Sequence, residues 1–269
     1  AVSGVFNALV AKMAERLGHR AVYLSGGALS AAHSVPDVGL LSVSEFVHEA
    51  RIIARATRLP LLCDADTGFG EALNVERTVR LFEEAGVAGI HLEDQEMPKR
   101  CGHLSGKAVV SAEAMSAKLR AAVAARRDPS FVIIARTDAR GVHGMDEAVR
   151  RARMYLDAGA DAIFPEALES PDEFAAFAKQ INAPLLANNT EFGRSPNLTV
   201  EAFGALGYCM TLFPLTAFRS ALKAAQETLK DLQALGHQRD RIPDMLTRAE
   251  LYDLLGYKDY EARDRAYFG

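Results

Sequence analysis

The chain has 269 residues, a net charge of −4 and a hydrophobic fraction of 49%, which is enough apolar material for one sizeable core. It has no clustered basic face for nucleic acid, and no apolar run reaches the ~18 residues that span a bilayer. The three cysteines are odd in number and lack a disulfide spacing, which favours a reducing, cytoplasmic compartment. Nucleic acid and membrane are therefore excluded as expected partners. Cys63 and Cys209 fall within apolar runs and are expected to be buried.

Short apolar runs alternate with longer amphipathic segments along the chain. The first segment is amphipathic rather than signal-like, and the chain starts at Ala rather than Met, which leaves its natural beginning open. Strand length and weak alternation, typical of strands covered on both faces, mark 21–24, 60–63, 88–92, 131–135, 160–164, 184–187 and 208–212. An eighth strand is expected at or before 1–4. Helical patterns span 6–18, 44–57, 73–86, 111–127, 145–158, 171–180, 199–205 and 215–235.

This alternation predicts parallel βαβ units. Seven or eight such units without a Gly-x-Gly-x-x-Gly turn favour a closed (β/α)8 TIM-type barrel of the α/β class over a dinucleotide-binding sheet. We expect a single barrel domain, 1–269, with a charged C-terminal helical extension at about 237–269. Two further short helical patterns lie in this extension, near 247–255 and 259–267, and packing or subunit contact is its expected role.

Polar residues follow nearly every predicted strand. Catalytic residues of barrels lie at the C-terminal ends of the strands and in the loops that follow, so this recurrence predicts an enzyme. The residues concerned are Ser25, Gly26, Gly27, Asp64, Asp66, Glu93, Asp94, Arg136, Glu166, Asn188, Thr190 and Arg219.

The acidic residues predict a metal site. Asp64 and Asp66 are separated by one residue, so a strand end would point both carboxylates to one side. With Glu93 and Asp94 after the next strand, four carboxylates are expected to converge. A site made of carboxylates alone suits Mg²⁺, and no His or Cys cluster has the spacing of a zinc site. The alternative is that these acids cap helices or pair with arginines at the rim.

Other strand ends predict binding of carboxylates. Ser25-Gly26-Gly27 would let backbone N–H groups cradle a carboxylate, with an ordinary tight turn as the alternative. Arg136 and Arg219 are expected to make bidentate carboxylate contacts, and Glu166 and Asn188 to fix a hydroxyl or further oxygens. A small polycarboxylate is therefore the expected substrate.

The segment Lys99-Arg100-Cys101-Gly102-His103 lies in a long polar loop, about 93–110. Two cations and an imidazole flank the thiol, which favours the thiolate and predicts an acid–base role for Cys101 near neutral pH. His103 is expected to orient the thiol or to bind a carboxylate. Loops of this length are often active-site lids, and Gly102 and Gly106 would let this one move.

Together these motifs resemble the isocitrate lyase/phosphoenolpyruvate mutase superfamily, nearly end to end. The matching segments are Gly4-Val5-Phe6-Asn7-Ala8, Tyr23-Leu24-Ser25-Gly26-Gly27, Asp64-Ala65-Asp66-Thr67-Gly68-Phe69-Gly70, Lys99-Arg100-Cys101-Gly102-His103, Ala135-Arg136-Thr137-Asp138, Phe164-Pro165-Glu166, Ala187-Asn188, Thr190-Glu191-Phe192-Gly193 and Phe213-Pro214-Leu215-Thr216-Ala217-Phe218-Arg219. The segment around Cys101 is specific to the lyase branch, because the phosphonate enzymes lack that cysteine.

The resemblance implies a barrel whose last helix is swapped onto a neighbouring subunit, in a homotetramer built as a dimer of dimers. It implies Mg²⁺, for which Mn²⁺ can substitute, held by Asp64, Asp66 and Glu93 mostly through water. The implied reaction cleaves 2-methylisocitrate to pyruvate and succinate by a retro-aldol (Claisen-type) step.

The methyl group of this substrate rests on two positions. Isocitrate lyases carry Trp where this chain has Phe164 and Thr where it has Pro214, and the smaller Phe leaves room for a methyl group, which is worth about 1–3 kcal/mol of discrimination. The loop continues Leu104-Ser105-Gly106-Lys107 where well-known bacterial methylisocitrate enzymes read Arg-Pro-Asn-Lys. A 2,3-dimethylmalate lyase, an isocitrate lyase or an oxaloacetate decarboxylase therefore remain alternatives.

The resemblance also implies roles for single residues. Tyr23 is the candidate base that takes the hydroxyl proton, with Asp37 or a metal-bound water as rivals, and Cys101 protonates the departing succinate half. The pyruvate end is held by Ser25, Gly26, Gly27 and Arg136. The remaining substrate-binding residues are expected to be Lys99, Arg100, Gly102, His103, Glu166, Asn188, Thr190 and Arg219. A non-catalytic barrel is the competing class, but the acids and Cys101 are all present.

Overall fold

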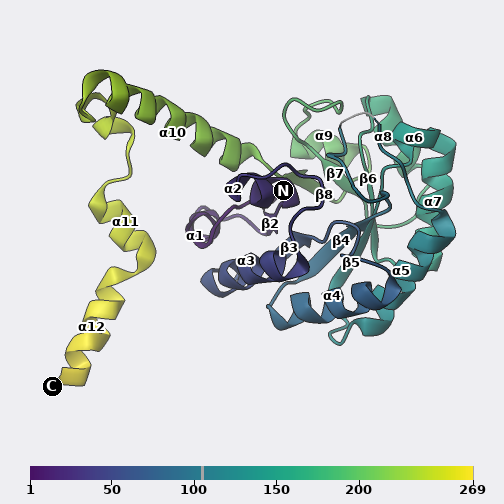
Figure 1. Ribbon diagram of the computed structural model, residues 1–269, viewed down its shortest axis with the longest axis horizontal. Helices are drawn as coiled ribbons and strands as arrows, with labels where there is room; N and C mark the ends of the chain where they lie inside the picture. The colour runs from purple at the N-terminus through teal and green to yellow at the C-terminus, as the bar shows by residue number, and fades with distance from the viewer. Residues whose placement is uncertain (104–105, 269) are drawn as a thin grey trace. The chain divides into compact units, whose positions relative to one another are not determined.

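The computed structural model describes residues 1–103 and 106–268. Eight parallel strands form one sheet in the order β6-β5-β4-β3-β2-β1-β8-β7. A parallel bridge between Ile163 in β6 and Leu185 beside β7 joins the two outer strands. The predicted (β/α)8 barrel is therefore confirmed (Figure 1). The strands are β1 (Val2–Gly4), β2 (Val22–Leu24), β3 (Leu61–Asp64), β4 (Gly89–Glu93), β5 (Val132–Thr137), β6 (Ala162–Pro165), β7 (Leu186–Asn188) and β8 (Met210–Phe213).

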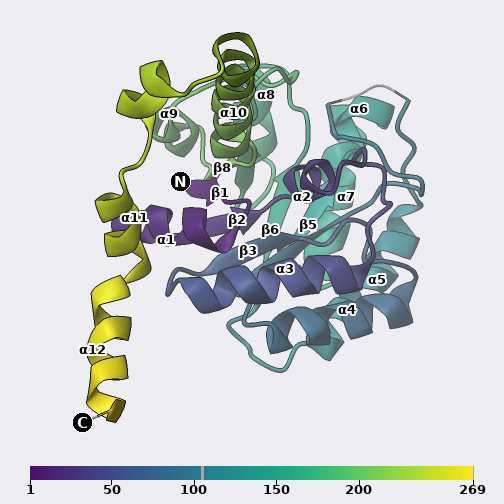
Figure 2. The same cartoon turned by 60° about the vertical axis from the view of Figure 1, so that its left-hand side comes forward.

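Helices cover the outside of the strands, as Figure 2 shows for α3, α4 and α5. All of the predicted helices of the barrel are present, within a few residues of the expected bounds. The helices are α1 (Ala8–Arg16), α2 (Gly26–Ala32), α3 (Val43–Ala56), α4 (Ala72–Glu84), α5 (Ala112–Ala125), α6 (Arg140–His143), α7 (Met145–Asp157), α8 (Pro171–Ala178) and α9 (Val200–Ala205).

Two of these helices, α2 and α6, were not predicted from the sequence. The motif Ser25-Gly26-Gly27 was expected to cradle a carboxylate, with a tight turn as the alternative, and glycine disfavours a helix interior. Instead Ser25 is the N-cap, and its Oγ accepts a hydrogen bond from the backbone N–H of Ala28 at 3.4 Å. The motif is therefore a helix N-terminus at the end of β2.

The alternation of side chains along each strand creates two cores. On β2, Val22 and Leu24 pack outward against the helices, whereas Tyr23 packs inside the barrel with Phe164. Since successive side chains of a strand point to opposite faces, neighbouring residues at a strand end must also diverge. Of the two apolar-run cysteines, Cys63 is buried as expected, but Cys209 is exposed because it precedes β8.

The chain divides into two compact units, Ala1–Thr216 and Ala217–Gly269. The second unit contains most of α10 (Thr216–Leu235), together with η1 (Arg239–Asp244), α11 (Arg248–Leu255) and α12 (Tyr257–Phe268). The second unit begins before position 237, the expected start of the C-terminal helical extension. Leu229 and Phe268 are among many large apolar side chains that this unit exposes. No helix among the described residues has both the length and the apolar character that a bilayer crossing requires.

Candidate active site

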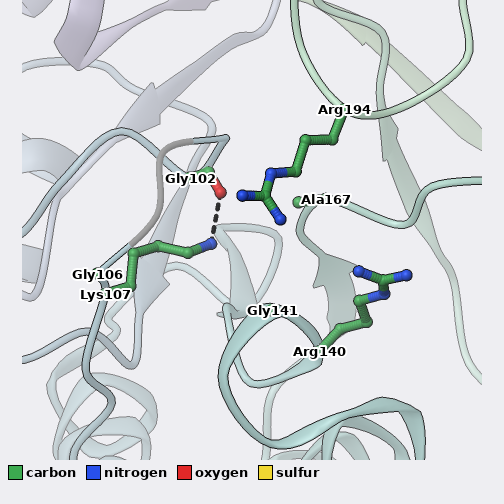
Figure 3. Close-up of a pocket in the computed structure, with 7 residues that line it drawn as sticks. All are labelled: Gly102, Gly106, Lys107, Arg140, Gly141, Ala167 and Arg194. Carbon is green, nitrogen blue, oxygen red and sulfur yellow. Dashed lines mark hydrogen bonds between the residues drawn. The ribbon is translucent and has the colours of Figure 1, made fainter.

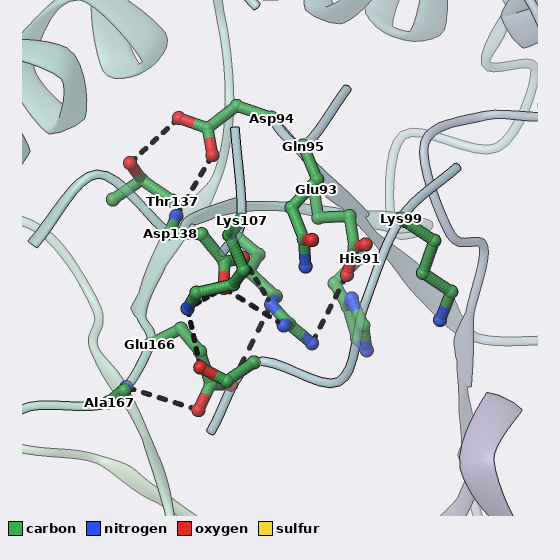
Figure 4. Close-up of polar contacts among 12 residues, drawn as sticks. His91, Glu93, Asp94, Gln95, Lys99, Lys107, Thr137, Asp138, Glu166 and Ala167 are labelled. Carbon is green, nitrogen blue, oxygen red and sulfur yellow. Dashed lines mark hydrogen bonds and ion pairs between the residues drawn. The ribbon is translucent and has the colours of Figure 1, made fainter. Parts of the chain in front are cut away.

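The C-terminal ends of the strands gather most of the predicted residues, and Figure 4 shows Glu93, Lys99 and Glu166 of this group. Asp64 ends β3, Glu93 ends β4 and Asn188 ends β7, while Arg136 lies in β5 and Glu166 directly follows β6. All five side chains are buried. The barrel thus brings together charged groups that would each be costly to bury alone.

Asp94 does not join this group, which corrects the expectation that four carboxylates converge. Its neighbour Glu93 faces the barrel interior, so Asp94 must face outward. There its Oδ2 accepts hydrogen bonds from Thr137 Oγ1 and Tyr155 OH, each at 2.8 Å, and from Arg151 at 3.2 Å. Figure 4 shows its carboxylate on the side of Thr137. Asp94 is therefore a structural residue that ties β4 to β5 and α7.

Asp64 and Asp66 do lie together. The backbone N–H of Asp66 donates to Asp64 Oδ1 at 3.0 Å, and that of Gly26, in the first turn of α2, donates to Asp64 Oδ2 at 3.1 Å. A Cβ atom on Gly26 would lie 2.7 Å from the same Oδ2, so only glycine fits this approach. The Ser25-Gly26-Gly27 motif and the first carboxylate are consequently one local structure.

Lys99 lies within this acidic group and not beside the thiol. Its Nζ is 2.5 Å from Asp37 Oδ1 and 2.6 Å from Asp66 Oδ1. Burial would lower the pKa of Lys99, but the surrounding carboxylates, Glu93 first, raise it. The ammonium is therefore charged and offsets part of the negative charge of the group.

Glu93 shows that a cation is still missing from the charge balance. Neither of its carboxylate oxygens has a hydrogen-bond partner in the described part of the chain, although Arg136 Nη1 is 3.2 Å from Oε2. Burial raises the pKa of Glu93 well above its ordinary value, and burial together with the charge of Asp64 raises that of Asp66 to about 7. The nearby cations, Arg136 and Lys99, only partly offset the effect of burial on these two pKa values.

The donor set fits Mg²⁺. Among residues 1–103 and 106–268, no three His, Cys, Asp or Glu side chains are arranged to hold a metal ion by themselves. Mg²⁺ does not require such a cage, because it keeps several waters and takes one or two direct carboxylates. Asp64, Asp66 and Glu93 supply oxygen donors only, and Glu93 has unpartnered oxygens for a cation or its waters.

Tyr23 is held below this group by His91. The phenol oxygen lies 2.7 Å from His91 Nε2, and the two rings stack. Burial lowers the pKa of His91 to about 4, so the imidazole is neutral, and burial raises the pKa of Tyr23 well above its ordinary value. The phenol therefore carries its proton when no metal is bound.

Arg136 lies between the acidic group and the second half of the site. Its Nε is 2.9 Å from Asp138 Oδ2 and 3.6 Å from Glu166 Oε2, and its guanidinium lies over the Phe164 ring at 5.3 Å. The three carboxylates around it raise its pKa despite the burial that opposes them. Arg136 is thus a permanently charged group in a fixed orientation.

Glu166 has a full set of partners. His103 Nε2 lies 2.9 Å from its Oε1, and Asn188 Nδ2 donates to its Oε2 at 3.2 Å. Burial raises the pKa of Glu166, but Arg136 and His103 lower it by more than burial raises it. Glu166 is therefore an anion. The backbone N–H of Arg194 donates to His103 Nδ1 at 3.0 Å, which leaves Nε2 as the nitrogen that carries the proton toward Glu166.

The cysteine segment lies directly against these residues. A Cβ atom on Gly102 would clash with Glu166 Cγ and Arg136 Nη2. Lys107 donates to the Gly102 carbonyl and to Asp138 Oδ1, the latter at 2.6 Å. Figure 3 shows Lys107 and Arg194 beside Gly102, at a small cavity of about 80 Å³. The segment is therefore held from both sides over Arg136 and Glu166.

The expectation that flanking cations favour the Cys101 thiolate is wrong. The Cys101 residue is exposed, yet the protein that surrounds the thiol desolvates it and raises its pKa, and the hydrogen bond from the His103 backbone only partly offsets this. Lys99 pairs with carboxylates instead of the thiol. At neutral pH the thiol carries its proton, which suits an acid.

Some predicted residues lie elsewhere, and some useful ones were missed. Arg219 lies on α10, Thr190 is buried in the loop after β7, and the Arg100 backbone pairs with Gln95. Leu104 and Ser105, where the loop sequence departs from known lyases, lie outside the described residues. Asp138, Lys107 and Arg194 were missed. Asp138 had a signal, since it follows Arg136 at the end of β5.

Comparisons with known proteins agree with this geometry. The family model for phosphoenolpyruvate phosphomutase matches residues 2–233. A 2-methylisocitrate lyase of Aeropyrum pernix is 54% identical over 97% of this chain and 84% of its own. A 2-methylisocitrate lyase of Escherichia coli (strain K12) is 44% identical over 97% of this chain and 89% of its own.

Solved structures of similar fold include three related enzymes. An oxaloacetate acetylhydrolase in complex with 3,3-difluorooxalacetate has a TM-score of 0.94 at 37% identity, over 100% of this chain and 92% of that one. A 2,3-dimethylmalate lyase has a TM-score of 0.93 at 32% identity, with 100% and 90% covered. A phosphonopyruvate hydrolase in complex with oxalate and Mg²⁺ has a TM-score of 0.90 at 35% identity, with 100% and 94% covered.

Proposed function

Because the chain belongs to the phosphoenolpyruvate mutase/isocitrate lyase family, we propose that it is a Mg²⁺-dependent carbon–carbon lyase that cleaves 2-methylisocitrate to pyruvate and succinate. The reaction is a retro-aldol (Claisen-type) cleavage. Relatives named 2-methylisocitrate lyase that cover nearly the whole chain support this substrate above the other activities of the family.

One observation carries the proposal: Gly102 lies in contact distance of both Arg136 and Glu166. The charges of Glu166, Arg136 and Asp37 also act on the thiol of the neighbouring Cys101, which supports a place for it between the carboxylate-binding groups and the acidic group. A thiol in that position can reach a carbon atom of a substrate that Arg136 and the acids hold between them. A carbon–carbon lyase needs a site that binds the 2-oxo-acid end of the substrate and, in addition, an acid that protonates the departing carbon atom. Cys101 is proposed to be that acid.

The acidic group is proposed to hold the metal. Asp64, Asp66 and Glu93 are its expected ligands, largely through water. A bound divalent cation, Mg²⁺ or in its place Mn²⁺, would supply Lewis-acid stabilisation of negative charge at the 2-oxo-acid end of the substrate. The Mg²⁺ in the related phosphonopyruvate hydrolase supports a divalent metal in this family.

The residues of the chain itself bind this end and take its proton. The N-terminal turn of α2, at Ser25, Gly26 and Gly27, attracts a carboxylate because N–H groups point outward there. Arg136 is permanently charged and faces the same space. The Asp37 carboxylate lies near Gly27, since a Cβ there would be 3.4 Å from Asp37 Oδ2. Tyr23 is proposed as the base that accepts the hydroxyl proton, with Asp37 or a metal-bound water as its rivals.

The succinate half leaves with an electron pair on carbon and needs a proton. Cys101 donates it, because the raised pKa of its thiol keeps the proton in place until a stronger base forms. Asn188, Thr190 and Arg219 are proposed to bind the carboxylates of this half. His103, held between Glu166 and the Arg194 backbone, is proposed to orient the Cys101 thiol beside them. Glu166, an anion itself, orients His103 and Arg136 and does not face the substrate carboxylates.

We propose further that the enzyme works in the cytoplasm as a homotetramer, a dimer of dimers whose C-terminal helices are swapped between subunits. The exposed apolar residues of α10 to α12, Leu229 and Tyr267 among them, support a covered surface in this unit. Segment 93–110 is proposed to close over bound substrate and exclude water.

A substrate panel tests the proposal. The protein is incubated with Mg²⁺ and separately with 2-methylisocitrate, isocitrate, 2,3-dimethylmalate and oxaloacetate, and products are identified by ¹H NMR. We expect equal amounts of pyruvate and succinate from 2-methylisocitrate, at the highest kcat/KM of the four. Preferred cleavage of 2,3-dimethylmalate, or turnover of oxaloacetate alone, would replace the proposed substrate while keeping the family chemistry.

A further inference from the structure

The loop that joins β3 to α4 has an unusual backbone. Here it is called the acid loop, residues 65–71. Asp66 and Phe69 have positive φ angles of 45° and 57°, and Gly68 and Gly70 have φ angles of 91° and 140°. Non-glycine residues rarely adopt such a conformation, because it strains the backbone. Asp66, an expected metal ligand, therefore needs contacts that hold it in place.

Two buried side chains from below provide such contacts. Lys118 of α5 donates from Nζ to the Thr67 carbonyl at 3.2 Å, and Thr78 of α4 donates from Oγ1 to the Gly68 carbonyl at 3.2 Å. Figure 2 shows α4 and α5 side by side. The two carbonyls belong to the two residues that follow Asp66, so the contacts fix the second and third peptide units after the Ala65–Asp66 peptide and hold the turn by which the chain leaves Asp66.

The burial of the Lys118 ammonium costs free energy, because the group has lost most of its contact with water. Its side chain is 8% exposed, and its ion pair with Glu71 is 4.0 Å long with a Glu71 side chain that is 87% exposed. Burial lowers the pKa of Lys118, and Glu71 only partly offsets this. An apolar side chain of similar length would pack there without that penalty. The ammonium is explained by the carbonyl that it holds.

We propose that Lys118 and Thr78 are positioning residues of the metal site. By holding the carbonyls of Thr67 and Gly68 they keep Asp66 in its left-handed conformation, with its carboxylate beside Asp64. The inference rests on the proposed metal-dependent function, since it states what fixes one of the expected ligands.

Matched variants test this inference with Mn²⁺ as a spectroscopic probe. Lys118→Met removes the ammonium but keeps an unbranched side chain, and Lys118→Arg keeps a positive charge. Thr78→Val removes the hydroxyl group, and Thr78→Ser keeps it. Ser116→Ala is the control, because Ser116 is buried on the same helix and its Oγ has no hydrogen-bond partner among the described residues. Mn²⁺ affinity is measured by electron paramagnetic resonance titration.

We expect Lys118→Met to weaken Mn²⁺ binding by about 10–100-fold, the usual effect of losing a residue that orients a metal ligand. Lys118→Arg and Thr78→Ser should retain most of the affinity, Thr78→Val should lose less than Lys118→Met, and Ser116→Ala should match the parent protein. Unchanged affinity in both Lys118→Met and Thr78→Val, or an equal loss in Ser116→Ala, overturns the inference.

Hydrogen exchange of residues 65–71, measured without metal, separates this inference from the proposed function. Faster exchange in Lys118→Met and Thr78→Val, but not in Ser116→Ala, supports the positioning role even if the parent protein binds no Mn²⁺, a result that would remove the metal from the proposed function. Unchanged exchange in both variants overturns the positioning role even if the parent protein is a metal-dependent lyase.

Discussion

Glu93 and Glu166 occupy matching places on two sides of the barrel, and their surroundings are opposite. Glu93 ends β4 and Glu166 directly follows β6, and each is 1% exposed. Glu93 has no hydrogen-bond partner among the described residues and a pKa raised by burial, whereas Glu166 pairs with His103 and has a lowered pKa. Since burial is equal, the difference comes from the neighbouring charges.

The two glutamates define two halves of the site. The acid half, at the ends of β2 to β4, holds Asp37, Asp64, Asp66 and Glu93 around one ammonium, that of Lys99. In the cation half, at β5 to β7, each carboxylate has a close cationic partner, as in the Lys107–Asp138 pair. The first half is short of positive charge and the second is already balanced. We infer that the first is built for a metal and the second for the carboxylates of a substrate.

Removal of metal should have the largest effect on activity. EDTA treatment followed by desalting is expected to abolish 2-methylisocitrate cleavage, and added Mg²⁺ to restore it, because without the metal no Lewis acid stabilises the negative charge that develops on the substrate. The measurement is pyruvate release in a coupled assay. Full activity in metal-free buffer would contradict the inference that the acid half binds a metal ion.

Cys101→Ser should have the next largest effect. A hydroxyl is a far weaker acid than a thiol, so kcat is expected to fall by about 10²–10⁴-fold, the usual contribution of a positioned acid or base. The unfolding midpoint should be unchanged, since the Cys101 residue is exposed. Cys209→Ser, at another exposed cysteine, is the control and should retain full activity. Near-normal turnover of Cys101→Ser would remove the acid role.

The pH profile of kcat should show a smaller effect. Burial raises the pKa of the Cys101 thiol, so the acid is present at neutral pH and is lost only as the pH rises through that raised value. The alkaline limb should therefore lie above the ordinary pKa of a cysteine. A limb near or below neutral pH would show that the thiolate predominates.

Arg194→Ala should have the smallest effect. It removes the hydrogen bond from Nε to the His103 carbonyl and the exposed ion pair from Nη1 to Glu169, each 3.3 Å long, but keeps the backbone contact to His103 Nδ1. The exposed ion pair contributes little, and the hydrogen bond is worth about 1 kcal/mol, or about fivefold in kcat/KM. Arg153→Ala, which removes a similar bond to the Gln180 carbonyl, is the control. A loss as large as that of Cys101→Ser would mean that this contact controls the acid.

The barrel could be predicted because each strand is a short apolar run between polar strand ends. Helix α2 could not, because two glycines oppose a helix locally and only the N-cap at Ser25 and the packing around Asp64 stabilise one. The direction of Asp94 was predictable, since the alternation of β4 that points Glu93 inward must point Asp94 outward.

The sequence indicated which residues make up the site more readily than it indicated which charged groups pair with one another. Lys99 is two residues from Cys101 in sequence, but its ammonium binds Asp37 and Asp66, so proximity in sequence gave the wrong surroundings for the thiol. Lys118 and Arg194 act on main-chain atoms of other loops. Such contacts depend on the tertiary arrangement of the loops, and no pattern of residue types in the sequence predicts them.

The most direct test compares the two glutamates in one titration. Mn²⁺ affinity is measured for Glu93→Gln and Glu166→Gln, two substitutions that remove one charge each and preserve shape. We predict that Glu93→Gln loses more than the ~10–100-fold typical of residues that only orient a metal ligand, and that Glu166→Gln binds Mn²⁺ like the parent protein. Equal losses in the two variants, or the larger loss in Glu166→Gln, would contradict the division of the site into an acid half and a cation half.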